Sequence, residues 1–424
     1  MEKERREKPE FSTPVYEMAL KQFDIASARL NLNPNVAQRL KSPKRALIVS
    51  VPIRMDNGNV RVFEGYRVQH TMVLGPAKGG TRYHPDINLG EVSALAMWMS
   101  WKCALIGLPL GGSKGGIRCN PKEMSRGELQ RLTRRYTTEI FPLIGPDRDI
   151  PGPDVGTDGQ TMSWLMDTYS MQVGYTVPGI ATGKPVKIGG SLGRIEATGR
   201  GVVYTVVEAA KRLNINLNGT TAVIQGFGNV GYVAAKILHE MGCKVIAVSN
   251  SIGGIYNEKG LDISRLYDFS QENRILSASR LGDNITNSEL LELKCDILIP
   301  AALPAQIDEN NAINVKCKIL AEGANGPTTP EADKILNEKG VFIIPDILAN
   351  SGGVTVSYFE WVQDLQNFFW KEKEINEKLR DILVSAFESV MSLAEREKVD
   401  HRTAALMLGI KKITDAMLIR GLYP

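Results

Sequence analysis

The chain has 424 residues, more than a typical single domain, so its length predicts two domains. Its composition, 43% hydrophobic and 23% charged, allows a sizeable core and excludes wholesale disorder. The net charge of +4 is too weak to indicate a nucleic-acid partner or a membrane surface.

Residues 1–11 alternate acidic and basic side chains without an apolar stretch, so they match neither a secretory nor an organellar signal. The most apolar region, residues 93–110, contains Lys102 and Pro109 and is too short to span a bilayer. The cysteines and histidines show no C-x-x-C pair and no zinc-like spacing. We therefore predict a cytoplasmic protein with reduced thiols and no bound metal.

The first half of the chain predicts strands and then helices. Alternation of apolar and polar residues predicts two strands joined by a hairpin turn at residues 55–58. In chain order, we expect strands at 46–54 and 59–70 and helices at 88–102 and 123–141. Asn88 is expected to cap the first helix, with Glu91 completing a capping box. The glycine-rich stretch 178–201 predicts a connection or a domain border.

Beyond this stretch, short apolar strands alternate with helices, which predicts a parallel sheet covered on both faces. We expect strands at 221–225, 244–249, 296–300, 318–321 and 341–344, and helices at 230–241 and from Pro330 to Gly340. The stretch 372–418 is helical and amphipathic. The prediction is an α/β protein with domains at 1–185 and 186–374, and with C-terminal helices at about 375–424 packing back on the first domain.

The segment Gly226–Gly231 has the pattern G-x-G-x-x-G between a predicted strand and a predicted helix. Gly226 permits a tight turn, Gly228 lets a pyrophosphate approach the backbone, and Gly231 lets helix and strand pack closely. The helix N-terminus then offers N–H groups to the phosphates. The competing interpretation is a glycine turn without a ligand, but the context on both sides favours a Rossmann-type, doubly wound dinucleotide-binding domain.

The end of the next strand normally supplies an acid that binds the adenosine ribose. Here that place holds Ser249, Asn250 and Ser251, without a carboxylate. Asn250 can bind a ribose hydroxyl but does not repel a 2′-phosphate, so NAD, NADP and dual use all remain open.

Three lysines stand in unusual surroundings. Lys78 and Lys114 lie in glycine-rich segments that we expect to form turns, where a substrate can approach closely. Lys102 lies on the apolar side of its predicted helix, where a charge needs a partner or a task. One such lysine would be interpreted as a solvated surface charge, but three indicate a site. Their repulsion and burial are expected to lower the pKa of one lysine toward neutrality, as proton transfer requires.

Asp154 offers a carboxylate partner for these lysines. It follows Pro151 and Pro153, which stiffen the loop in which we expect it to lie. The competing interpretation is an aspartate that only forms a turn.

A series of motifs follows the order of one known family. They are Lys78–Pro85, Pro109–Gly116, Pro151–Asp154, Thr182–Lys184, Glu196–Gly199, Gln225–Gly231, Ala324–Thr329 and Gly352–Ser357. Together they resemble the glutamate/leucine/phenylalanine/valine dehydrogenase superfamily, and most closely its hexameric glutamate dehydrogenases. The resemblance covers nearly the whole chain.

The resemblance implies substrate roles for individual residues. Lys114 is expected to be the catalytic lysine, and Asp154 the acid that moves protons to and from the amino group. Lys102 would bind the α-carboxylate, while Lys78 and Ser357 would bind the γ-carboxylate. Further substrate contacts are expected at Gly79, Thr182 and Val354.

The resemblance also implies cofactor contacts and an architecture. The contacts are expected at Thr198, Gly226, Gly228, Asn229, Val230, Gly231, Ser249, Asn250, Ala301 and Asn325, the last near the nicotinamide. The first domain would carry a mixed sheet and serve substrate binding and assembly into a homohexamer. The site would lie in a cleft between the domains, at the carboxyl edge of the parallel sheet.

The implied reaction is the reversible, NAD- or NADP-dependent oxidative deamination of L-glutamate to 2-oxoglutarate and ammonia. Lys78 favours glutamate, because an aliphatic substrate would leave its buried charge unpaired. Two alternatives remain open: a dehydrogenase for another amino acid, and a catalytically inert nucleotide-binding subunit that regulates a partner.

Overall fold

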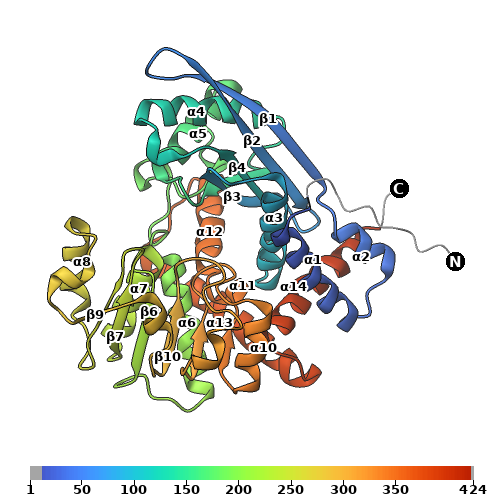
Figure 1. Cartoon of the computed structure of the whole chain (residues 1–424). Helices are drawn as coiled ribbons and strands as arrows, with labels where there is room; N and C mark the ends of the chain where they lie inside the picture. Colours follow the sequence, from blue (N-terminus) through green and yellow to red (C-terminus); the bar gives the residue numbers. More distant parts are fainter. Residues whose placement is uncertain (1–11, 422–424) are drawn as a thin grey trace. The chain divides into compact units, whose positions relative to one another are not determined.

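A computed structural model describes residues 12–421, and Figure 1 traces their elements along the chain. These residues pack into two compact units. Unit 1 comprises residues 12–191, 357–370 and 406–421, and unit 2 comprises residues 192–356 and 371–405. The predicted α/β class is confirmed, and the break after residue 191 falls inside the glycine-rich stretch 178–201. The expectation for residues 1–11 lies outside the described residues.

Unit 1 is built on a five-stranded mixed sheet with the strand order β1-β2-β4-β3-β5. The strands are β1 (Arg45–Arg54), β2 (Val60–Thr71), β3 (Ala77–His84), β4 (Gly111–Arg118) and β5 (Asp149–Pro153). β1 and β2 form the predicted hairpin, and Gly58 at its turn has a φ of 87°. β3 pairs in parallel with both β4 and β5, so these three strands end at the same edge of the sheet.

β3 and β4 correct the prediction that the glycine-rich segments around Lys78 and Lys114 form turns. Both segments are strands, and their glycines serve close packing. A Cβ on Gly79 would lie 1.6 Å from the carbonyl oxygen of Ser113, and a Cβ on Gly112 would lie 2.3 Å from the backbone nitrogen of Ser100. The glycines therefore let neighbouring backbones approach.

Helices cover both faces of this sheet. The helices of this part of the chain are α1 (Pro14–Arg29), α2 (Pro34–Leu40), α3 (Leu89–Leu105), α4 (Arg126–Ile140) and α5 (Gly159–Val173), and α1 packs on α3. α3 packs on one face, against Gly112, and α4 packs on the other, where Tyr136 contacts Gly65. Asn88 caps α3 as predicted. The predicted capping box is wrong, because the Glu91 carboxylate accepts a hydrogen bond from Arg82.

Unit 2 contains a seven-stranded sheet with the order β12-β11-β10-β6-β7-β8-β9. The strands are β6 (Thr221–Gln225), β7 (Lys244–Ser249), β8 (Gly254–Tyr256), β9 (Asp283–Ile285), β10 (Ile297–Pro300), β11 (Ile319–Ala321) and β12 (Phe342–Ile344). The five strands from β12 to β7 are parallel, as predicted. β8 and β9 extend the sheet in antiparallel pairing, and these three-residue strands were not predicted.

Helices pack on both faces of this second sheet, which is the doubly wound arrangement. The helices of this part of the chain are α6 (Ala197–Arg212), α7 (Asn229–Glu240), α8 (Ile263–Glu272), α9 (Asn287–Leu291), α10 (Pro330–Glu338) and α11 (Asp346–Ala349). Among them, α8 packs on α7, and α11 packs on α6. α9 and α10 share a core with Val223 and Leu320. α7 lies on the opposite face, because its Gly231 contacts Ile224, which alternates with Val223 along β6.

The C-terminal helices divide between the two units. α12 (Gly352–Gln366) and α14 (His401–Arg420) contribute residues to both units, while α13 (Glu372–Glu397) belongs to unit 2. The prediction that all of residues 375–424 pack on the first domain is therefore wrong for α13. Its buried apolar stripe packs on α6, where Leu383 meets Gly201.

Candidate active site

The lysine site is built on the parallel strands of unit 1. Lys78 on β3 pairs with Gly112 on β4, and Lys114 lies two residues further along β4. Side chains alternate between the faces of a strand, so Lys78 and Arg82 point to one face of β3, as Gly112 and Lys114 do on β4. Gly112 contacts α3, so this face is the one covered by α3.

Lys114 and Asp154 form an ion pair on this face. The Nζ of Lys114 lies 2.6 Å from the Oδ2 of Asp154, which follows β5. Arg82 donates a hydrogen bond from Nε to the same oxygen over 3.0 Å, and its Nη1 lies 2.7 Å from the Oε1 of Glu91. Gly80 leaves room for the pair, because a Cβ there would lie 3.4 Å from the Nζ of Lys114. The structure therefore brings the two predicted catalytic residues together.

Burial lowers the pKa of Lys114; Asp154 opposes this shift, and the nearby cations Arg82 and Arg67 add to it. Burial alone would raise the pKa of Asp154, but Lys114 and Arg82 hold it well below its usual range. The predicted repulsion from other lysines is replaced in the structure by repulsion from two arginines. The site thus holds an ionised carboxylate beside an amine that releases its proton more readily than usual.

Lys78 and Lys102 are also buried, with 3% and 8% of their surface exposed. The Nζ of Lys78 lies over Gly152 on β5, where a Cβ would come within 2.7 Å of it. Burial raises the pKa of the Cys103 thiol to about 12, while Lys78 and Lys102 act in the opposite direction. Both ammonium groups therefore lie within electrostatic reach of one sulfur atom.

Thr182 completes the surroundings of Lys78. Its hydroxyl oxygen lies 3.3 Å from the position that a Cβ on Gly152 would occupy. It is fully buried, and no residue of the described chain makes a hydrogen bond to this hydroxyl. A buried hydroxyl without a partner is costly, and a ligand that supplies a partner removes that cost.

The opposite face of the same strands carries a buried ionic network. Arg67 on β2 forms a two-pronged ion pair with Asp149, the first residue of β5. Ser113 donates a hydrogen bond to Asp149 over 2.6 Å and accepts one from Arg67 over 2.9 Å. The network ties β2, β4 and β5 together and so fixes the positions of Lys114 and Asp154 on the other face.

The remaining predicted substrate residues lie on α12. Ser357 is buried and belongs to unit 1, together with Lys78, Gly79, Lys102, Lys114, Asp154 and Thr182. Val354 is half-buried and belongs to unit 2. The boundary between the units thus runs through this helix.

The glycine turn of unit 2 has the geometry that a pyrophosphate requires. Gly226 has a φ of 91°, and a Cβ on Gly231 would lie 1.7 Å from the carbonyl oxygen of Gly226. A Cβ on Gly228, in contrast, would meet nothing within 4 Å. Gly228 also caps α7 without a side-chain hydrogen bond, so the helix N-terminus presents its N–H groups to this open space. These residues fit a dinucleotide.

The other predicted cofactor residues also lie in unit 2. Asn229 and Val230 open α7, and Ala301 packs against Gly226. Thr198 lies in the first turn of α6, beside Gly353.

Ser249 and Asn250 stand at the end of β7. Asn250 donates a hydrogen bond from Nδ2 to the carbonyl of Arg274, and its Oδ1 accepts hydrogen bonds from Ile252 and Gly253. This side chain therefore stabilises its own loop, a role that was not predicted from the sequence.

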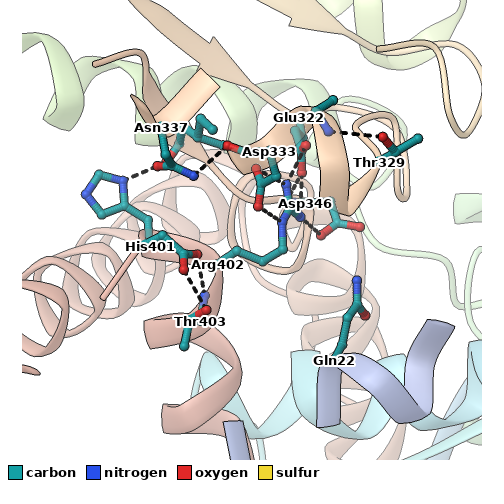
Figure 2. Close-up of polar contacts among 12 residues, drawn as sticks. Gln22, Glu322, Thr329, Asp333, Asn337, Asp346, His401, Arg402 and Thr403 are labelled. Atoms are coloured by element: carbon teal, nitrogen blue, oxygen red, sulfur yellow. Dashed lines mark hydrogen bonds and ion pairs between the residues drawn. The ribbon is translucent and has the colours of Figure 1, made fainter. Parts of the chain in front are cut away.

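Asn325 lies in a loop that a second ionic cluster anchors, shown in Figure 2. Arg402 on α14 forms ion pairs with Glu322, Asp333 and Asp346, over 2.7, 2.8 and 3.2 Å. Asp346 in turn accepts a hydrogen bond from the backbone nitrogen of Gly326 over 2.8 Å.

Arg402 therefore acts through Asp346 on the backbone of Gly326, next to Asn325. Burial raises the pKa of Glu322, although Arg402 acts against the shift. Asn350 makes a second tie, donating a hydrogen bond from Nδ2 to the Oδ1 of Asn325 over 2.9 Å.

Arg82 and Arg402 were not predicted from the sequence as parts of the site. A signal for Arg82 was present, because it stands four residues after Lys78 and shares its face once the segment is a strand. Arg402 gave no signal, since its partner Glu322 is 80 residues away in the chain.

The lysine–carboxylate site of unit 1 and the dinucleotide turn of unit 2 define the class of dinucleotide-dependent dehydrogenases. The profile of the Glutamate/Leucine/Phenylalanine/Valine dehydrogenase family matches residues 189–421, and that of its dimerisation domain matches residues 43–171. The chain belongs to this family.

Known glutamate dehydrogenases are similar to this chain in sequence over nearly its whole length. The glutamate dehydrogenase of Thermotoga maritima is 54% identical, covering 97% of this chain and 99% of that protein. The catabolic NAD-specific glutamate dehydrogenase RocG of Bacillus subtilis is 50% identical over 93% of both chains.

Among solved structures, the hetero-hexameric glutamate dehydrogenase of Thermus thermophilus (Leu bound form) is 40% identical. Its TM-score is 0.95, with 99% of this chain and all of that chain covered. Glutamate dehydrogenase from Peptoniphilus asaccharolyticus is also 40% identical, with a TM-score of 0.85 and coverage of 96% and 100%. Between residues 12 and 421, no helix has both the length and the apolar character that crossing a membrane requires.

Proposed function

We propose that this enzyme interconverts L-glutamate with 2-oxoglutarate and ammonia. The observation that carries the proposal is the buried cation Lys78, which lies over Gly152 on the same face of the sheet as the Lys114–Asp154 pair. A buried ammonium group favours a substrate whose side chain ends in a carboxylate. The names of the relatives, which are glutamate dehydrogenases, support the same substrate.

The proposed roles follow from the chemistry of each group. Lys102 binds the α-carboxylate, and Lys78, Thr182 and Ser357 surround the γ-carboxylate, with Gly79 and Val354 as further contacts. A bound nicotinamide supplies the acceptor for the hydride that leaves Cα. Lys114, whose pKa burial lowers, removes a proton from the water that attacks the resulting iminium carbon. Asp154, ion-paired with Lys114, transiently accepts a proton from it and passes that proton to the departing amine.

Several further features are part of the proposal. The residues that hold the coenzyme are Thr198, the turn Gly226–Gly231, Ser249, Asn250, Ala301 and Asn325. We propose NAD as the preferred coenzyme, since RocG is NAD-specific by name and no basic residue stands at 249–251 to bind a 2′-phosphate. We also propose a homohexamer in the cytoplasm, which the hexameric relative of Thermus thermophilus supports.

The direct experiment is a spectrophotometric assay of the purified chain with glutamate and each of NAD and NADP. The expected result is coenzyme reduction that depends on glutamate and is faster with NAD. A panel with leucine, valine and phenylalanine tests the rival amino-acid substrates. No reduction with any amino acid would instead support the regulatory-subunit alternative.

Lys78→Leu refines the test, with Lys122→Leu as a matched control at an exposed position of the same unit. Removing the cation should lower kcat/KM for glutamate by roughly a hundredfold or more and relatively favour norvaline, which lacks the γ-carboxylate. If folded Lys78→Leu shows unchanged kinetics with glutamate, Lys78 does not bind the γ-carboxylate.

A further inference from the structure

A buried ionic cluster in unit 1 lies directly behind the loop that carries Thr182. Lys184 extends its Nζ to within 2.7 Å of the Oε1 of Glu360 and 2.8 Å of the Oδ2 of Asp364. All three side chains are shielded completely from solvent. Burying three charges is costly and stabilises less than apolar packing of similar volume, so such a cluster calls for an explanation beyond stability.

The cluster fixes the backbone on both sides of Thr182. On one side, Lys184 donates a hydrogen bond from Nζ to the carbonyl of Ala181. On the other side, Glu360 accepts a hydrogen bond from the backbone nitrogen of Gly183 over 2.8 Å. Thr182 itself donates its backbone N–H to Pro151, next to Gly152 over which Lys78 lies. The Thr182 hydroxyl is therefore held in place by its neighbours, while no residue of the described chain bonds to it.

The same cluster determines the placement of Ser357. Glu360 and Asp364 follow Ser357 on α12 by three and seven residues, so the three side chains share one face of the helix. The ion pairs with Lys184 therefore bind that face of α12 to the Thr182 loop. A single lysine thus connects the two hydroxyl-bearing residues that stand with Lys78 in the proposed γ-carboxylate pocket.

We propose that Lys184, Glu360 and Asp364 are positioning residues that set the Thr182 and Ser357 hydroxyls around the substrate's terminal carboxylate and thereby determine selectivity for dicarboxylic substrates. The inference rests on the proposed function and deepens it. Burial raises the pKa of Asp364 to about 6, against the pull of Lys184 and with added repulsion from Glu360. Of the three residues in this cluster, Lys184 carries the positive charge. Replacing it with an uncharged residue therefore removes the ion-pair partner of both Glu360 and Asp364.

The test compares two 2-oxo acids that differ only at the far end. 2-Oxoglutarate ends in a carboxylate, and 2-oxovalerate, with the same number of carbons, ends in a methyl group. The ratio of their kcat/KM values in reductive amination does not depend on the fraction of folded enzyme, so it separates positioning from stability. Lys184→Met removes the cation that pairs with Glu360 and Asp364. Asp364→Asn removes the charge of Asp364 while keeping the shape of the side chain. Lys411→Met, the control, makes the same substitution at an exposed ion pair of unit 1.

The expected result is a fall of the ratio by about tenfold or more in Lys184→Met and about twofold to threefold in Asp364→Asn, through KM for 2-oxoglutarate. Lys411→Met should keep the wild-type ratio. An unchanged ratio in folded Lys184→Met, or an equal loss with both substrates, would overturn the inference. If Lys184→Met does not fold, Asp364→Asn decides, and an unchanged ratio there overturns it too. Absence of 2-oxoglutarate turnover in the wild-type enzyme would instead overturn the proposed function.

Discussion

The Nζ of Lys114 lies 2.6 Å from the Oδ2 of Asp154, on a face of the sheet that is buried from solvent. Lys114→Ala should lower kcat by roughly a thousandfold, because it removes the group proposed to activate water. The fold should survive, since Arg82 remains paired with Asp154. Initial rates, with circular dichroism as the check of folding, measure the effect. Near wild-type turnover in the folded variant would remove Lys114 from the chemistry.

Arg82 makes the pH dependence testable. The proposed reaction needs Lys114 as the neutral amine, so the deamination rate should rise as the pH passes through the pKa of Lys114. Arg82 is one of the causes that lower this pKa, along with burial. Arg82→Met should therefore raise it and move the rising limb of the kcat profile to higher pH. Arg82→Lys retains the charge and should leave the limb nearer its wild-type position; a shift of the Arg82→Met limb to lower pH would contradict the assignment.

Alanine substitutions at two glycines of the dinucleotide turn should have different effects, one on coenzyme binding and one on stability. Gly228→Ala adds a methyl group to open space, so the fold should be unaffected while KM for the coenzyme rises about tenfold or more through a clash with the phosphates. Gly231→Ala places a methyl group 1.7 Å from a carbonyl oxygen, so it should lower the melting temperature of the protein. Thermal unfolding and coenzyme titration measure both effects. Unchanged coenzyme binding in Gly228→Ala would place the phosphates elsewhere.

Arg402 should influence binding of the coenzyme more than binding of the amino acid. Its ion pairs anchor the segment from Glu322 to Gly326, which carries Asn325. Arg402→Met should raise KM for NAD several-fold, with a smaller effect on KM for glutamate, because the loop loses its anchor. Arg396→Met changes an exposed arginine of unit 2 and serves as the control. An effect confined to KM for glutamate would contradict this role.

The sequence predicted most of the nucleotide-binding sheet and less of the lysine site. The parallel strands of unit 2 are apolar runs with clear turn signals, and their positions agree with prediction within a residue or two. The glycine-rich segments of β3 and β4 predicted turns, whereas the two-residue spacing of Lys78, Gly80 and Arg82 already followed the period of a strand. The Lys184 cluster could not be predicted, because Lys184 and Glu360 lie 176 residues apart.

Ser113 and Lys114 are neighbours in β4, yet they serve opposite sides of the sheet. Single substitutions on either side can be accommodated separately, as long as each residue keeps its place in the strand. Deletion or insertion of one residue within Gly111–Arg118 would exchange the sides, turning an ammonium group toward Arg67 and a hydroxyl toward the substrate. Functional variants of this strand, natural or engineered, should therefore differ by substitutions that keep its length. Insertions and deletions should be confined to the connecting loops.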